Sequence, residues 1–258
     1  MSAGILRLST PVTGISMQSD HFEIQTPITT FYTNAVIVTV PLGCLQRAKI
    51  SFNPPLSARI QSAIHNLGFG NLEKIFLKFE RAWWTKKFLS DTPELYTFLP
   101  PLSLPPDAPD QLLNVFSLAS LPVNAQPVLA IYTAGTWSTY LTTKSDDEIA
   151  DLFETHFLPS LPNFTSDCII TGVFRTDWAG DPFSCGSYTH VPSGSEDGIE
   201  DLRILGEQIM ELPKGSGGLW FAGEHAGRWD LATVNGAMTS GAMAALDIWK
   251  ALEKEYTE

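Results

Sequence analysis

The stretch Leu219 to Trp249, LWFAGEHAGRWDLATVNGAMTSGAMAALDIW, decides the fold that we expect for this chain. It opens with LWFA, an apolar run next to glycine that is too short for a stable helix, which predicts a buried strand. Gly223 and Glu224 follow at the carboxyl end of that strand, where open α/β sheets usually bind their ligands. The pattern predicts a ligand site at a sheet edge, although a purely structural role also fits it.

A helix is predicted to begin near Thr233, after the loop that follows the glycine and the glutamate. Apolar residues recur at intervals of three and four, so that one face of the helix can pack inward. They are Val234, Met238, Gly241, Ala242, Ala245, Ile248, Trp249 and Leu252. Small residues in the first turns let a ligand or another backbone come close. The unpaired N–H groups and the positive dipole end there favour an anion or a developing negative charge.

The composition is that of a folded protein with one large or two small domains. Of the 258 residues, 44% are hydrophobic, which is ample for a core. Sixteen basic against 28 acidic residues give a net charge of -12. That charge argues against direct nucleic-acid binding and is compatible with cationic substrates. Three cysteines without metal-type spacing indicate neither a disulfide framework nor a zinc site, so we expect free, buried thiols.

No segment predicts a membrane span or a secretory signal. No apolar run approaches the roughly 18 residues needed to cross a membrane, and the N-terminus lacks the uninterrupted apolar segment of a signal peptide. We therefore expect a soluble protein inside the cell, with no transmembrane segment.

The first part of the chain alternates like a small β meander over residues 12–40. Its last strand, Ala35 to Val40, is almost continuously apolar and β-branched, as expected for a strand buried on both faces of a parallel sheet. Pro41-Leu42-Gly43 is expected to stop it, and residues 50–56 to form a proline-stiffened connector. Ser57 can cap a helix over Ala58 to Leu67, which Gly68-Phe69-Gly70 would close.

Residues 71–84 predict a strand with two different faces. Glu73, Ile75, Leu77 and Phe79 share one face, and Leu72, Lys74, Phe76 and Lys78 share the other. Further strands are predicted near residues 112–118, 127–135 and 167–174. A capping box of Ser145 and Glu148 opens a helix that should run to about Phe157.

Three segments now align in order with a known family: AVIVTVPLGCLQ at 35–46, LGFGNLEKIFLKFERAWW at 67–84 and WAGDPFSCGSYTH at 178–190. Followed by LWFAGEH and ATVNGA, they resemble the C-terminal two thirds of an FAD-dependent amine oxidase. This family includes polyamine oxidases, monoamine oxidases and lysine-specific histone demethylases. The resemblance covers most of residues 30–250.

The resemblance implies a mixed α/β fold. One part would be the C-terminal portion of a Rossmann-like FAD-binding domain, and the other a substrate domain built on a mixed sheet. The expected boundaries are an FAD-domain fragment at 1–70, a substrate-binding domain at 71–194 and a C-terminal FAD-binding segment at 195–258.

The resemblance also implies the residues near the reacting atoms. Lys74 takes the place of the family lysine that holds a water against flavin N5, and could orient that water and O2 during flavin reoxidation. Tyr188 takes the place of the tyrosine that forms one wall of an aromatic cage beside the flavin. Trp178 and Phe183 match aromatic positions near the cofactor. Such a cage suits an amine, because ring faces attract ammonium groups. Core packing remains an equal interpretation of Trp178 and Phe183.

Other positions match the family's contacts to FAD. Val40 and Pro41 correspond to the turn that lines the adenine end, and Glu224 to a glutamate that contacts the cofactor. Thr233 and Val234 correspond to residues whose backbone meets the cofactor at the helix start. One departure is Asn235-Gly236, where the family usually has histidine and glycine, and Met238 and Met243 also replace more typical residues.

The glycine-rich motif of a dinucleotide site, Gly-x-Gly-x-x-Gly after a strand, does not occur in this chain. We expect it upstream of residue 1 and do not expect tight FAD binding by the chain alone. The leading hypothesis is an N-terminally truncated FAD-dependent amine oxidase, with a polyamine and O2 as substrates. The alternative is a catalytically inactive protein that keeps the fold as an interaction or regulatory module.

Overall fold

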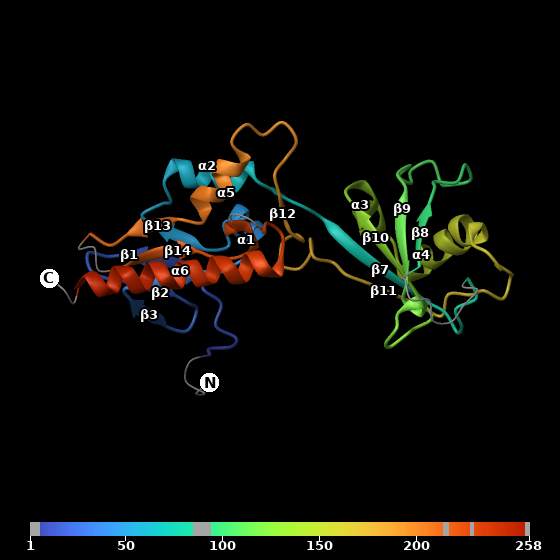
Figure 1. Ribbon diagram of the computed structural model, residues 1–258, viewed down its shortest axis with the longest axis horizontal. Helices are drawn as coiled ribbons and strands as arrows, with labels where there is room; N and C mark the ends of the chain where they lie inside the picture. The colour runs from blue at the N-terminus through green and yellow to red at the C-terminus, as the bar shows by residue number, and fades with distance from the viewer. Residues whose placement is uncertain (1–5, 85–93, 214–216, 228–229, 256–258) are drawn as a thin grey trace. The chain divides into compact units, whose positions relative to one another are not determined.

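The computed structural model describes residues 6–84, 94–213, 217–227 and 230–255. The chain forms two compact units (Figure 1), the first from residues 1–70 and 180–258 and the second from residues 71–179. The second unit ends at Ala179, whereas the sequence places the end of the substrate-binding domain at 194. Both units combine helices with sheets, which confirms the mixed α/β class.

Two sheets form the frame of the first unit. The four-stranded sheet has the order β3-β2-β1-β5, with antiparallel pairs among β1 to β3 and a parallel pair between β1 and β5. Its strands are β1 (Gly14–Met17), β2 (Phe22–Gln25), β3 (Thr30–Thr33) and β5 (Ser51–Asn53). The three-stranded sheet has the order β13-β14-β4. Its strands are β4 (Ala35–Val38), β13 (Gln208–Glu211) and β14 (Gly218–Phe221).

Short helices and one long helix complete the first unit. They are α1 (Leu42–Gln46), α2 (Ala58–Asn66), α5 (Gly198–Leu205), the 3-10 turn η4 (Glu224–Ala226) and α6 (Val234–Glu255). A two-residue ladder joins β6 (Gly68–Phe69) to β12 (Thr189–His190). Among the helices that the structure describes, none is both long and apolar enough to cross a membrane.

The parallel pairing of β14 with β4 bears out the sequence pattern of both strands. Gly218 pairs with Ala35 and Phe221 with Val38, and all four residues of β14 are buried. Leu219 and Phe221 pack into the main core of this unit. Trp220 turns to the other face, where it packs with Ala244 of α6. The strand LWF is therefore buried on both faces.

Two local predictions in this unit are wrong. The segment at 50–56 is not only a connector, because β5 lies within it and pairs with β1. Gly68 and Phe69 do not close α2. The helix ends at Asn66, and the two residues pair with β12 instead. The predicted stop at Pro41 is confirmed, because β4 ends at Val38, and Pro41 is the N-cap residue of α1.

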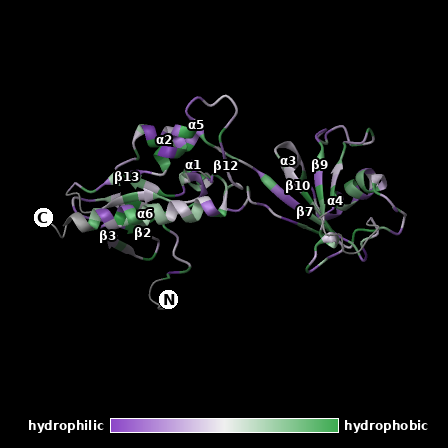
Figure 2. Cartoon of the chain, viewed as in Figure 1, coloured by the Kyte–Doolittle hydropathy of each residue, from purple (hydrophilic) through white to green (hydrophobic). Residues whose placement is uncertain are grey.

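The second unit is built on an antiparallel sheet of order β11-β7-β10-β9-β8. Its strands are β7 (Leu72–Lys78), β8 (Leu95–Phe98), β9 (Leu113–Ser117), β10 (Val128–Ala134) and β11 (Gly172–Arg175). Its helical elements are η1 (Leu118–Ser120), α3 (Thr136–Thr142), α4 (Asp146–Leu152), η2 (Phe153–Phe157) and η3 (Leu158–Ser160). Hydrophilic and hydrophobic residues mix along β7 (Figure 2), and its buried positions alternate as predicted.

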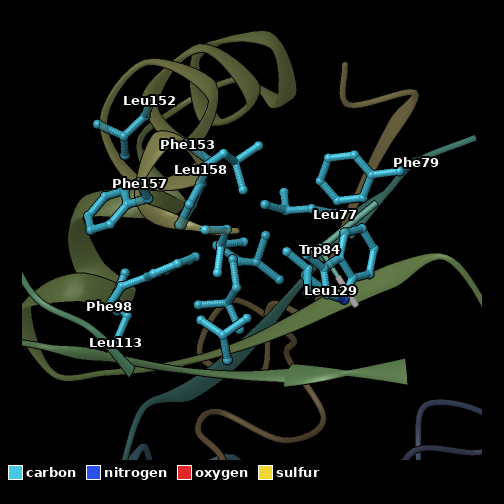
Figure 3. Packing of buried hydrophobic residues seen from close by; sticks show 14 of the residues in the cluster. Leu77, Phe79, Trp84, Phe98, Leu113, Leu129, Leu152, Phe153, Phe157 and Leu158 are labelled. Carbon is cyan, nitrogen blue, oxygen red and sulfur yellow. The ribbon is translucent and has the colours of Figure 1, made fainter. Parts of the chain in front are cut away.

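One face of this sheet carries the core of the second unit. Side chains from the strands and from α4 and η2 point toward one another (Figure 3), including Leu77, Leu129 and Phe153, which are completely buried. Ser145 and Glu148 form the predicted capping box, and helical structure continues to Phe157 as η2. The strand predicted at 167–174 is shorter, because only Gly172–Arg175 pairs with β7.

Candidate functional site

The turn after β14 is tied to α6 through one hydroxyl group. The Gly223 N–H donates to Ser240 Oγ at 2.9 Å. The same hydroxyl lies 2.8 Å from the Gly223 carbonyl oxygen and 2.9 Å from that of Ala237, to which it can donate. Gly223 has φ 151°, and a Cβ there would lie 2.8 Å from the ring of His225. Only glycine therefore fits this turn, which places Glu224 directly after the strand.

The carboxylate of Glu224 holds a residue that sequence reasoning missed. Its Oε1 accepts a hydrogen bond from Thr189 Oγ1 at 2.6 Å, and its Oε2 accepts one from the Thr189 N–H at 3.3 Å. Thr189 is 1% exposed. It directly follows Tyr188, so the glutamate after β14 positions the segment that carries the predicted cage tyrosine. In the sequence, Thr189 is only a threonine next to the Gly-Ser-Tyr run. That position alone does not indicate that it binds Glu224.

Backbone bonds to Gly70 fix Tyr188 further. The Gly70 N–H donates to the Tyr188 carbonyl at 2.8 Å, and the Gly70 carbonyl accepts from the Ser187 N–H at 2.8 Å. The Tyr188 side chain stays 38% exposed. Its ring is thus held on a rigid ladder with part of its surface open to a ligand.

The N-terminus of α6 has the open donors that the sequence predicts. Thr233 Oγ1 accepts from the Gly236 N–H at 3.0 Å and so caps the helix. No acceptor among the described residues takes the N–H of Val234 or Asn235, and the Val234 side chain is 76% exposed. A Cβ on Gly236 would collide with the backbone of Asp230, so this glycine serves backbone packing.

A cavity of about 510 Å³ lies along β4. Aliphatic residues of β1, β2 and β4 dominate its lining, which includes Val40, Cys44, Lys49 and Phe183. The cavity therefore brings together two of the predicted cofactor residues, Val40 and Phe183. Pro41 is not part of this lining and lies at the start of α1. Phe183 itself is 76% exposed.

These features fit part of a flavin nucleotide. An apolar cavity of this size can take a flat ring system, and the uncovered N–H groups at the start of α6 suit a negative charge. Glu224 can accept additional hydrogen bonds, since each carboxylate oxygen has two lone pairs. Val40, Phe183, Glu224, Thr233 and Val234 are the residues that would hold the cofactor.

The second unit holds the predicted lysine. Lys74 lies opposite Tyr132 of β10, and its Nζ lies 5.3 Å from the centroid of that ring. Tyr132 in turn packs against Phe116, with ring centroids 4.9 Å apart. Within the described residues, no carboxylate lies within 4.0 Å of Lys74 Nζ. A ring face attracts a cation without using its N–H donors in a salt bridge, so the ammonium group of Lys74 can still donate to a ligand or a water.

A buried carboxylate that sequence reasoning missed fixes the segment beside Lys74. Glu73 is 3% exposed, and its Oε1 accepts from the N–H groups of Trp178 and Ala179 at 2.8 and 3.3 Å. Its Oε2 accepts from the hydroxyl of Thr176 at 2.5 Å. The Trp178 side chain is 42% exposed. Glu73 therefore orients the backbone of the predicted aromatic residue, although its alternation with Ile75 and Leu77 indicates only that it is buried.

The predicted site residues divide between the two units. Lys74 and Trp178 belong to the second unit. The others, all in the first unit, are Val40, Pro41, Phe183, Tyr188, Glu224, Thr233 and Val234.

His225 is a buried polar residue beside Glu224. It is 1% exposed, and neither ring nitrogen has a hydrogen-bond partner among the residues that the structure describes. Burial lowers the pKa of His225 to about 4, so the ring is neutral at pH 7. No sequence pattern in LWFAGEH indicated that this histidine would be enclosed.

The comparison with protein families matches this chain to one family. The model for flavin containing amine oxidoreductases aligns with residues 3–248. That span includes β4, β14, α6 up to Ile248 and all of the second unit, so the match covers the predicted site residues of each unit.

Curated relatives agree with the family match. The chain is 35% identical to the human peroxisomal N(1)-acetyl-spermine/spermidine oxidase over 240 residues, which cover 85% of this chain and 44% of the relative. It is 30% identical to human lysine-specific histone demethylase 2 over 252 residues, 94% of this chain and 28% of the relative. It is 31% identical to polyamine oxidase 4 of Oryza sativa subsp. japonica, over 93% of this chain and 44% of the relative.

The chain thus spans less than half the length of these three relatives, between 28% and 44%. The family match nevertheless covers nearly all of its residues. By that match, and in agreement with the motifs in its sequence, the chain belongs to the flavin-containing amine oxidoreductase family.

Proposed function

We propose that this chain forms part of an FAD-dependent amine oxidase that acts on small cationic amines, with polyamines as the favoured class. The proposal rests on one arrangement of hydrogen bonds. Ser240 connects the Gly223 turn to α6. Glu224, the next residue, binds Thr189, which directly follows Tyr188. This arrangement supports a cofactor site next to an open aromatic ring.

The chain's own residues would bind and orient the reactants. When bound, FAD supplies the redox chemistry, in which a hydride leaves the carbon next to the amine nitrogen and O2 is reduced to H2O2. The N–H groups at the start of α6 would stabilise negative charge on the cofactor. The ring of Tyr188 would attract the substrate ammonium group, and a net charge of -12 favours the approach of a cation.

Lys74 would act in the second half of the reaction, in which O2 reoxidises the reduced flavin. Its ammonium group offers three N–H donors, which can hold a water and orient O2 near it. The ring of Tyr132 lies 5.3 Å from Nζ and helps to position the ammonium group. Polyamine substrates are favoured over methylated lysine because the identity is 35% to the acetyl-spermine/spermidine oxidase and 30% to lysine-specific histone demethylase 2.

The first experiment measures flavin binding by this chain. FAD is added, free cofactor is removed, and the visible spectrum is recorded for bands at roughly 370 and 450 nm, where the free flavin absorbs. Val234→Pro should weaken the retention of FAD, because proline fits the first turn of a helix but lacks the N–H. Val234→Ala keeps the N–H and is the matched control. Absence of retained flavin in the unsubstituted chain would show that it is not a holoenzyme by itself.

The second experiment measures turnover in a flavin-loaded form. Spermine, spermidine and a methyl-lysine peptide are compared by peroxidase-coupled detection of H2O2. Peroxide from the polyamines alone supports the proposed substrate class, and peroxide from the peptide alone contradicts it. Lys74→Met should slow reoxidation of reduced flavin by O2, while Lys78→Met, an exposed position on the same strand, should not. Equal rates for both variants would refute the role of Lys74.

One observation favours a second function, an inactive member that acts as an interaction module. Large apolar side chains are exposed along α6: Val234, Met238, Met243, Leu246 and Trp249. A group of exposed apolar side chains on one helix is a feature of binding surfaces for other proteins. Retention of FAD by the chain would contradict this second function, because an interaction module has no need for the cofactor.

A further inference from the structure

Two of the three cysteines lie side by side in the first unit. Cys44 on α1 and Cys185 in the segment before Tyr188 have their sulfur atoms 3.9 Å apart, and each residue is 5% exposed. Both are free thiols. The third cysteine, Cys168, belongs to the second unit, where its sulfur lies 3.2 Å from Thr165 Oγ1. Cys44 and Cys185 therefore form a separate pair.

The backbones that carry this pair approach closely because of a glycine. A Cβ on Gly43 would lie 2.6 Å from the carbonyl oxygen of Cys185, so a larger residue would force the two segments apart. On the other side, the Cys185 N–H donates to the Asp181 carbonyl at 2.9 Å, and the Phe183 N–H donates to Asp181 Oδ1 at 3.1 Å. These two bonds fix the turn of Cys185, and the Cys44 thiol joins it to α1 by donating to the Phe183 carbonyl at 3.1 Å.

The environment slows the oxidation of Cys44 and still leaves small molecules a route to this residue. Burial, and then the hydrogen bond to Cys185, raise the pKa of Cys44 to about 11. Cys44 is therefore protonated at pH 7 and reacts slowly with oxidants, since the thiolate is the nucleophile. Cys44 also lines the 510 Å³ cavity along β4, together with Lys49. A molecule as small as hydrogen peroxide can reach Cys44 from this cavity.

We propose that Cys44 and Cys185 form a modification site, a dithiol that hydrogen peroxide converts into an intramolecular disulfide. The sulfur of Cys44 attacks one peroxide oxygen, the O–O bond breaks, and a sulfenic acid and one water form. The sulfur of Cys185 then attacks the sulfenic sulfur, and the S–O bond breaks to release a second water. Two thiols lose two electrons and two protons, and one peroxide is reduced to two waters.

The geometry needs only a local adjustment. A disulfide has its sulfurs about 2.05 Å apart, so the present separation of 3.9 Å must shrink by rotation of the two side chains. The bond would join residues 141 positions apart and fasten the segment of Tyr188 to α1. Closing so long a loop stabilises the folded state chiefly by restricting the unfolded chain. The proposed amine oxidation releases the same oxidant, but the site itself does not depend on that function, because peroxide can be added.

The experiment counts thiols before and after treatment with H2O2. The chain is treated, unfolded and alkylated with iodoacetamide. We expect the alkylated cysteines to fall from three to one, with an intact mass about 2 Da lower before alkylation, as loss of two hydrogens requires. A peptide containing both Cys44 and Cys185 should appear on digestion, dithiothreitol should reverse the change, and the melting temperature should rise by several degrees.

Three variants make the outcome specific. Cys168→Ala should still form the cross-link, whereas Cys44→Ala and Cys185→Ala should each keep two alkylatable thiols. The two single variants provide the same readout, so either one suffices if the other does not fold. Three alkylatable thiols after treatment, a cross-link that includes Cys168, or the mass of a sulfinic acid in place of the disulfide would overturn the proposal. None of these readouts requires flavin, so failure here is distinct from failure of the proposed function.

Discussion

At the scale of single residues, Glu224 is expected to contribute to stability as well as to cofactor binding. It accepts two hydrogen bonds from Thr189, whose polar atoms are buried. Glu224→Ala leaves both donors without a partner, so the free energy of unfolding should fall by about 1–3 kcal/mol. Urea denaturation measures the change. Glu211→Ala, at an exposed position of β13, is the matched control and should change stability by less than about 0.5 kcal/mol.

A double-mutant cycle tests whether the two residues act as a pair. Thr189→Val removes the hydroxyl donor with little change of shape. If Glu224 acts through Thr189, the double variant should lose less stability than the sum of the two single variants. Strict additivity would contradict a direct contact.

His225 should make stability depend on pH. The folded protein has its pKa near 4 because the ring is buried, while the unfolded chain has it near 6.5. Between these two pKa values the unfolded state binds more protons than the folded state, so the free energy of unfolding increases with pH. The contribution of His225 to stability is therefore complete above about pH 6.5 and decreases as the pH falls toward 4. The full loss is on the order of 3 kcal/mol, at about 1.4 kcal/mol for each unit of pKa.

Denaturation curves at several pH values from 4 to 7 test this expectation. His225→Phe removes the ionisable ring and should flatten the dependence in that range. His65→Phe, at an exposed position on α2, is the control and should leave the slope unchanged. A His225→Phe variant with the slope of the unsubstituted chain would show that other groups cause the acid sensitivity.

At the scale of elements, two glycines near the start of α6 should respond in opposite directions. Gly223→Ala forces a Cβ into a backbone with φ 151° and to within 2.8 Å of the His225 ring, so it should cost about 1–3 kcal/mol. Gly241 lies inside α6, where a Cβ would meet nothing within 4 Å. Gly241→Ala should therefore stabilise the chain by about 0.5–1 kcal/mol, because alanine is the better helix former.

Thermal and urea denaturation of the two variants show whether each substitution stabilises or destabilises the chain. A stabilising Gly223→Ala would mean that the turn adopts another backbone conformation in solution. If Gly241→Ala stabilises the chain but weakens FAD retention, the open space at Gly241 serves the close approach of a ligand, as the small residues of this helix suggest.

Elements with local signals could be predicted from the sequence, and those that depend on distant partners could not. The apolar runs of β4 and β14, the serine cap of α2 and the capping box of α4 lie within a few residues of the structure that they determine. The ladder of β6 with β12 has no such signal, because two residues become a strand only when a distant segment pairs with them.

The same distinction holds for the candidate site. The resemblance to the family indicated Tyr188 and Glu224, since each lies in a recognisable motif. It did not indicate Thr189 or Glu73, which act through hydrogen bonds to segments far away in the chain. A buried carboxylate is recognised only when the groups that donate to it are known. Family motifs therefore identify candidate residues, whereas the structure identifies what orients them.

At the scale of the whole molecule, each unit has hydrophobic core clusters of its own, which predicts that the second unit folds alone. Every residue of its core cluster, from Ile75 to Cys168, lies within residues 71–179. The core clusters of the first unit draw on residues before 70 and after 180. A continuous segment of this size with its own core has the properties of an independent domain.

We therefore expect a fragment of residues 71–179 to unfold cooperatively. Its near-ultraviolet circular dichroism should show ordered aromatic rings, because Trp84, Trp137 and Phe157 are fully buried in this core. Phe157→Ala should cost about 3–5 kcal/mol and lower the melting temperature sharply, as expected for a large cavity in a packed core. Tyr132→Ala, at a partly exposed position on β10, should cost much less. A fragment without a cooperative transition, or equal effects of the two substitutions, would show that this core depends on the rest of the chain.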